Sequence, residues 1–143
     1  MLMNMSESIP PLQPVPPVTT NTSSSTRSWE VLCHLSSLAG LFVGFWGIPL
    51  LNILGPLCVW LVKRNDGPGI DAHGKESINF HLSWTLYGFV GVILLIVTLI
   101  GILAVPFFIW GMCALMTILT LIAGVKASNG ELYRYPLTIR FLK

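Results

Sequence analysis

The sequence predicts an all-α, polytopic integral membrane protein with four transmembrane helices, the first two short and arranged as a hairpin. Three observations favour this class. The 143 residues are 53% hydrophobic and 10% charged, whereas a soluble domain carries about a quarter charged residues. The mean hydropathy is +0.74. The apolar residues form two long blocks, separated by one densely polar passage at residues 63–81.

The chain divides into three parts. Residues 1–28 form an N-terminal tail that holds five of the ten prolines and a Ser/Thr tract. Such a segment has little apolar surface to bury, so we expect it to be disordered. Residues 29–127 form the four-helix transmembrane domain, and residues 128–143 form a short C-terminal tail that we expect on the cytoplasmic side.

The first apolar block, residues 29–62, is too long for one straight span. As a single helix it would be ~51 Å long, whereas the hydrocarbon core is ~30 Å thick. Residues 44–49 (GFWGIP) contain two glycines and a proline, which break helices. We therefore predict helices at about 29–45 and 49–63, with Pro49 in the first turn of the second. A tilted or re-entrant hairpin and a single long bent helix remain as alternatives.

The second block is predicted to form two full spans. Asp71 is a natural N-cap for a helix from about residue 72 to residue 103. Pro106 then opens a helix at about 106–127, after a short uncharged turn. Asn129 and Gly130 form a helix stop, and Tyr133 and Tyr135 suit the water interface.

The distribution of basic residues predicts the orientation. With four helices, both termini and the polar passage lie on one side of the membrane. All eight basic residues are then on that side: Arg27, Lys63, Arg64, Lys75, Lys126, Arg134, Arg140 and Lys143. The positive-inside rule makes this side cytoplasmic, and we expect a bacterial plasma membrane.

Other function classes find little support. The net charge of +2 leaves no electrostatic footprint for nucleic acid. The three cysteines, Cys33, Cys58 and Cys113, have no paired spacing, which argues against a disulfide framework or a zinc site. No nucleotide, phosphate or hydrolase motif is present, so we expect no cofactor and no enzymatic activity.

One polar cluster is a candidate for structure or interaction. Its members are His34, His73, Glu76, Asn79 and His81. One hypothesis is a metal site, but the histidine spacing does not match a zincin motif. A second hypothesis places the groups at the interface, with their heads in water. A third is a buried polar contact in which Glu76 and Asn79 of the third helix bond His34 of the first, as polar side chains within membrane bundles do.

A second candidate is a packing face on the first helix. Ser36, Gly40 and Gly44 recur at four-residue spacing and so lie on one face. Small residues in this arrangement let two membrane helices approach closely. The alternative is that small residues are simply frequent in membrane helices.

Four stretches resemble a known family. They are residues 34–40 (HLSSLAG), 55–63 (GPLCVWLVK), 73–80 (HGKESINF) and 126–136 (KASNGELYRYP). They are similar to a small bacterial membrane family of unknown function that is grouped with the chloroplast inner-envelope import component Tic-twenty. The resemblance covers about 29–143 and implies four membrane helices, with plant relatives linked to a protein-conducting channel. Ser77 departs from it, since the family usually has alanine there.

These observations lead to three function hypotheses. The first is a non-enzymatic membrane component, a scaffold or translocation-related subunit, that contacts partners through residues 63–81 and the C-terminal tail. The second is a small channel or transporter, built as an oligomer through the Ser36, Gly40 and Gly44 face. The third is an intramembrane metalloenzyme centred on His73, Glu76 and His81. The expected partners are the lipid bilayer and either further copies of this chain or another membrane protein.

Overall fold

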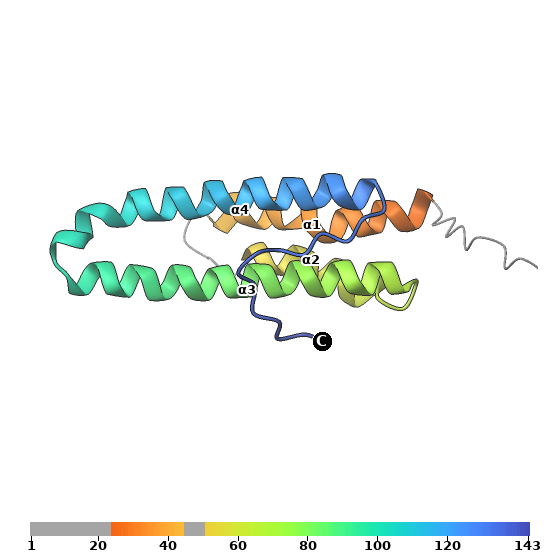
Figure 1. The fold of residues 1–143 in the computed structure, drawn as a ribbon, viewed down its shortest axis with the longest axis horizontal. Coiled ribbons are helices and arrows are strands. Elements are labelled where there is room, and N and C mark those ends of the chain that lie inside the picture. Colours follow the sequence, from red (N-terminus) through yellow and green to blue (C-terminus); the bar gives the residue numbers. More distant parts are fainter. Residues whose placement is uncertain (1–23, 45–50) are drawn as a thin grey trace, which may run out of the picture.

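The computed structural model describes residues 24–44 and 51–143 (Figure 1). The prediction of an all-helical chain is confirmed in this part, which contains no strand. The helices are α1 (Ser24–Gly44), α2 (Leu51–Lys63), α3 (Pro68–Val97), the short 3-10 helix η1 (Ile100–Ala104) and α4 (Val105–Ser128). The C-terminal segment, residues 129–143, runs back along the bundle without regular structure. Most of the predicted N-terminal tail (1–23) and Pro49 lie outside the described residues.

The first apolar block forms two antiparallel helices rather than one long bent helix. A Cβ atom on Gly40 of α1 would overlap the backbone at Leu51 and Asn52 of α2. A Cβ atom on Gly55 of α2 would overlap the backbone of Ser36 in α1. The contact moves from residue 51 to residue 55 along α2 while it moves back from residue 40 to residue 36 along α1. The two helices are therefore antiparallel. Both glycines are therefore required by the close approach of the two backbones.

Two predicted helix starts need correction. α1 begins at Ser24, five residues before the expected Trp29. α3 begins at Pro68, so Asp71 is not its N-cap; it lies in the first turn. Pro68 starts the helix because its fixed φ suits the first helical position and its missing N–H leaves no donor unsatisfied. The N-cap is Gly67, which has an extended backbone and no side chain to bond the first amides of the helix.

The turn between α3 and α4 is longer than predicted. α3 ends at Val97, not near residue 103, and Leu99 adopts a left-handed backbone (φ 57°). η1 follows at once and leads into α4. The chain thereby reverses over seven residues, Thr98 to Ala104, none of which is charged.

The predicted stop at Asn129 and Gly130 is confirmed. The Gly130 amide donates to the Ala127 carbonyl (2.9 Å) and the Glu131 amide donates to the Lys126 carbonyl (2.9 Å). Gly130 has a φ of 81°, which a residue without a side chain adopts at little cost. This pair of bonds is a Schellman motif, which ends α4 and turns the C-terminal segment back toward α3.

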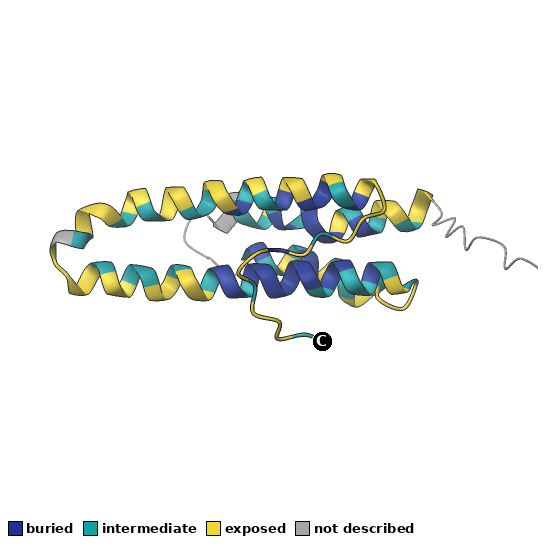
Figure 2. Ribbon diagram, in the orientation of Figure 1, coloured by how far each residue is buried: buried dark blue, intermediate teal, exposed yellow. Residues whose placement is uncertain are grey.

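Burial divides the molecule along its length (Figure 2). In α3, the buried residues run from Ile70 to Trp84; in α4, the first one is Met116. Beyond these positions the α3–α4 hairpin extends past α1 and α2 and exposes large apolar side chains. They include Phe89, Leu94, Val97, Leu103, Phe107 and Trp110. A soluble protein rarely exposes so continuous an apolar surface, whereas lipid accommodates it.

Two helices of the described chain, not four, are long and apolar enough to cross a membrane. They are Pro68–Val97 and Gly101–Ser128. α2 has 13 residues, or ~20 Å, and is shorter than a hydrocarbon core of ~30 Å. α1 carries Arg27, Glu30 and His34 in its first half. The prediction of four transmembrane helices is thus supported for α3 and α4 alone.

Candidate functional site

All five residues of the predicted polar cluster are buried inside the bundle. The exposed fractions of His34, His73, Glu76, Asn79 and His81 lie between 0% and 7%. The hypothesis that their polar heads reach water is therefore wrong. A buried polar group costs free energy unless it has a hydrogen-bond partner, so the partners explain why the cluster exists.

His34 of α1 connects three parts of the chain. Its Nε2 lies 2.9 Å from Nδ1 of His73 on α3, and its Nδ1 lies 3.0 Å from the Tyr135 hydroxyl in the C-terminal segment. Each contact needs one donor and one acceptor, so a neutral His34 ring donates in one of them and accepts in the other. The third helix does contact the first through His34, but its partner is His73. The predicted partners, Glu76 and Asn79, bond the C-terminal segment instead.

Tyr135 is held at three points. Its hydroxyl reaches His34, and its backbone amide donates to Oε1 of Glu76 (3.0 Å). Its ring stacks on Phe80, with centroids 3.9 Å apart and planes 11° from parallel. The residue is 3% exposed, so the prediction that it lies at the water interface is wrong. Burial raises the pKa of the Tyr135 phenol well above its usual range.

The second oxygen of Glu76 faces a cation. Its Oε2 lies 3.6 Å from Nε of Arg140, which also belongs to the C-terminal segment. The carboxylate thus holds a backbone amide with one oxygen and pairs with a guanidinium through the other. This occupancy explains how an acid can be buried among apolar helices.

Asn79 fixes the end of the C-terminal segment. Its Oδ1 accepts from the backbone amides of Phe141 (3.0 Å) and Leu142 (2.8 Å), and its Nδ2 donates to the Leu142 carbonyl (2.9 Å). One side chain therefore satisfies three backbone groups of a segment that has no regular structure of its own.

Two further residues of α3 continue this row. Ser83 accepts from the Ile139 amide (2.9 Å), and the Tyr87 hydroxyl donates to the Leu137 carbonyl (3.0 Å). Leu137 has a φ of 55°, and the chain reverses there before returning toward Asn79. The row of Glu76, Asn79, Ser83 and Tyr87 is defined here as the α3 polar stripe. Its spacing of three or four residues puts all four on one face.

Sequence reasoning missed the partner of this stripe. The face that contains Glu76, Asn79 and Ser83 was visible in the helical spacing, but nothing in that spacing identified the C-terminal segment as its partner. Tyr135 and Tyr87 were missed as cluster residues. The available signal was a row of polar residues along a helix that is otherwise apolar, since such a row needs partners inside the membrane protein.

His81 stands apart from the rest of the cluster. Its Nδ1 bonds the Ser77 carbonyl one turn earlier (2.8 Å), and its ring packs edge-on against Phe80. The proposed ligand set of His73, Glu76 and His81 is therefore not brought together. Among the described residues, no group of three or more His, Cys, Asp or Glu side chains is arranged to hold a metal ion.

The predicted packing face is used within the chain. Ser36 and Gly40 lie against α2, as described above. Gly44 is the last residue of α1, and its surroundings are outside the described part. The structure thus identifies a partner helix from the same chain for two of the three residues.

The basic residues gather at the end of the bundle where α2 meets α3. Lys63, Arg64 and Lys75 flank the α2–α3 turn, and Lys126 lies at the end of α4. The guanidinium of Arg27, near the start of α1, would lie 3.3 Å from a Cβ on Gly130. The opposite end, formed by residues 98–104, carries no charge. The molecule therefore has one basic end and one apolar end.

Comparison with known proteins identifies the family. A family model for MamF/MmsF proteins, described as the magnetosome magnetite crystal formation protein family, matches residues 25–142. No curated protein and no solved structure matches the chain significantly. The resemblance to a Tic-twenty-like family is wrong, because the matching family is the magnetosome one. The match covers nearly all of the described residues, and the chain therefore belongs to the magnetosome magnetite crystal formation protein family.

Proposed function

We propose that this protein is a non-enzymatic membrane component that takes part in magnetite crystal formation by organising partners at the basic end of its bundle. Membership of the family supports participation in magnetite crystal formation. The two apolar helices support a membrane location. The α3 polar stripe supports the non-enzymatic role, because its groups are bonded to the chain itself.

The observation that carries the proposal is the docking of the C-terminal segment on α3. Glu76, Asn79 and Ser83 fix the backbone of residues 135–142. This leaves other side chains of the segment at the surface, among them Leu137 (77% exposed), Ile139 (41%) and Phe141 (49%). A segment with a fixed backbone and exposed apolar side chains is preorganised for contact with a partner.

The orientation belongs to the same proposal. With the basic end in the cytoplasm, in agreement with the positive-inside rule, the α2–α3 turn lies on the cytoplasmic side. The C-terminal segment runs from that side along α3, so that Leu137 and Ile139 lie beside Tyr87 and Ser83 and form a contact surface deeper along the bundle. The α3–α4 hairpin then crosses the membrane twice. α1 and α2 enter it only in part, as a re-entrant hairpin.

The experiment has two arms. The first expresses this chain in magnetite-forming cells that lack their own family member and measures crystal size by electron microscopy. Restored crystal size supports a role in crystal formation, and crystals that stay unchanged would contradict that role. The second arm cross-links the same cells mildly and purifies the protein. A stoichiometric partner that is lost in a chain ending at Arg134 supports the contact surface, whereas recovery of the same partner with that shortened chain would contradict it.

A further inference from the structure

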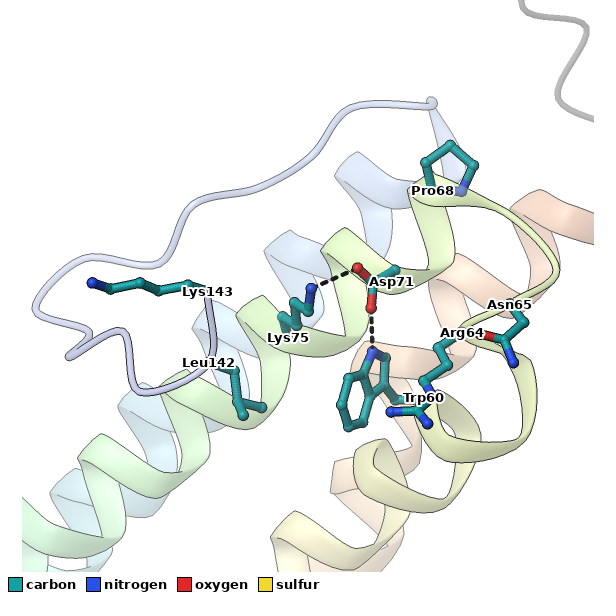
Figure 3. A pocket seen from close by; sticks show the side chains of 8 residues that line it. All are labelled: Trp60, Arg64, Asn65, Pro68, Asp71, Lys75, Leu142 and Lys143. Atoms are coloured by element: carbon teal, nitrogen blue, oxygen red, sulfur yellow. Dashed lines mark hydrogen bonds and ion pairs between the residues drawn. The ribbon is translucent and has the colours of Figure 1, made fainter.

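The basic end contains a surface pocket that the proposed function does not use. It has a volume of about 510 Å³ and lies between the end of α2, the first turns of α3 and the last residues of the chain (Figure 3). Three cations line it, Arg64, Lys75 and Lys143, against one acid, Asp71. The pocket therefore has an excess of positive charge.

The wall of the pocket is held rigidly. Nε1 of Trp60 donates to Oδ1 of Asp71 (2.8 Å), and Nζ of Lys75 pairs with Oδ2 of the same carboxylate (2.7 Å), as Figure 3 shows. The indole also lies on Gly74, where any Cβ atom would overlap it. Because both oxygens of Asp71 are engaged, its negative charge is largely compensated inside the wall.

The remaining cations are available to a ligand. The Arg64 guanidinium lies 5.2 Å from the centre of the Trp60 ring, a cation–π contact that orients it without neutralising it. Within the described part of the chain, neither Arg64 nor Lys143 forms an ion pair, although the positive charge of Arg64 acts on the Asp71 carboxylate from a distance. Both are contributed by segments that end at the same pocket, one by the α2–α3 turn and one by the C-terminal segment.

The location specifies the class of ligand. The pocket adjoins the polar start of α3, and the apolar length of that helix follows within a few turns. This is the level of lipid headgroups, where basic pockets beside membrane helices bind anionic lipids. Arginine is well suited to phosphate because its planar fork donates to two oxygens at once. We propose that this pocket binds a phosphoryl group, carried by an anionic lipid headgroup or present as free phosphate.

The test measures binding to the purified full-length protein in a neutral detergent. The probes are short-chain phosphatidylglycerol, short-chain phosphatidylcholine and inorganic phosphate, each titrated calorimetrically. The expected result is selective binding of phosphatidylglycerol over phosphatidylcholine. Removal of the two basic residues that form no ion pair within the described chain, in the variant Arg64→Gln/Lys143→Gln, should weaken it by roughly fivefold per charge. The control Lys126→Gln/Arg134→Gln removes the same charge outside the pocket and should bind like the unchanged protein.

Competition between the probes shows which source supplies the phosphoryl group. Competition by inorganic phosphate at similar concentration identifies free phosphate as sufficient, while weak competition identifies the lipid as the source; either supports a phosphoryl site. Equal binding of the two lipids, or equal losses in the two double variants, would overturn it. The single variant Arg64→Gln separates binding from folding, because Arg64 is exposed and forms no ion pair within the described residues.

Discussion

The hydroxyl of Tyr135 lies 3.0 Å from Nδ1 of His34, although 101 positions separate the two residues in the chain. Together with the contact between His34 and His73, it joins the first helix, the third helix and the C-terminal segment in one buried row. Several consequences can be measured.

The first prediction concerns this hydrogen bond. Tyr135→Phe keeps the ring on Phe80 but leaves a buried ring nitrogen of His34 without its partner. We expect the free energy of unfolding to fall by about 1–3 kcal/mol, the usual cost of a buried polar group left unpaired. Denaturant unfolding in detergent measures it. Tyr133→Phe is the control, since its hydroxyl forms no hydrogen bond with any of the residues that the structure describes; equal losses in both variants would contradict the assignment.

The second prediction follows from the raised pKa of Tyr135. The ordinary phenol pKa is 10.0, and the folded state holds the proton more tightly than the unfolded chain does. The resulting stability is fully present below about pH 10 and is lost as the pH rises above it. Unfolding measured from pH 8 to pH 11 should therefore show a steeper alkaline loss for the unchanged protein than for Tyr135→Phe. Parallel curves would argue that the phenol is not buried.

A third prediction concerns the anchor of the C-terminal segment. Asn79→Ala removes three hydrogen bonds to Phe141 and Leu142. We expect amide exchange in residues 140–142 to accelerate by roughly tenfold or more, since a loss of about 1.4 kcal/mol in local stability is already tenfold. Hydrogen–deuterium exchange read by mass spectrometry gives the answer. Asn65→Ala, on the exposed α2–α3 turn, serves as control and should leave these amides unchanged.

A fourth prediction compares two glycines. Gly40→Ala forces a methyl group into the backbone at Leu51, and overpacking of this kind typically costs about 1–3 kcal/mol. Gly111 is also in a helix interior, but no atom lies within 4 Å of a Cβ placed there. Gly111→Ala should thus be neutral or stabilising by up to roughly 1 kcal/mol. Melting temperatures in one detergent compare the two, and a similar loss in both would show that α1 and α2 are not in close contact.

The fifth prediction tests the orientation. In a chain whose native cysteines are replaced, single cysteines are placed at Gly67, Asn129 and Leu103 and treated with an impermeant thiol reagent in sealed vesicles isolated from magnetite-forming cells. Gly67→Cys and Asn129→Cys, at the basic end, should react directly, because that end is expected to face the cytoplasm. Leu103→Cys, at the apolar end, should react only after the membrane is opened. Labelling of Gly67→Cys and Asn129→Cys from opposite sides would exclude the hairpin of α3 and α4.

Local signals in the sequence predicted much of the helical framework. Asn129 and Gly130 ended α4 as expected, because the left-handed cap depends on neighbouring residues alone. Asp71 was wrongly predicted as an N-cap because its role is not set by neighbouring residues alone. It is a good N-cap by type, but Trp60 and Lys75 engage its carboxylate, and Trp60 approaches it only through the packing of α2 on α3.

The candidate site was predictable in part. Helical spacing placed Glu76, Asn79 and Ser83 on one face, and burial of that face follows from the cost of polar groups in lipid. Tyr135 could not be predicted as their partner. A tyrosine near the end of a membrane helix usually lies at the interface, and its burial here depends on the return of the chain along α3, which no local pattern encodes.

The shorter reach of α1 and α2 gives the molecule an unequal cross-section. Four helices, each ~10 Å wide with side chains, lie side by side at the basic end. Only α3 and α4 continue to the other end (Figure 2). Such a wedge occupies more area in one leaflet than in the other. It fits best where the bilayer bends with its convex face on the basic side, as in a small vesicle whose outer surface faces the cytoplasm.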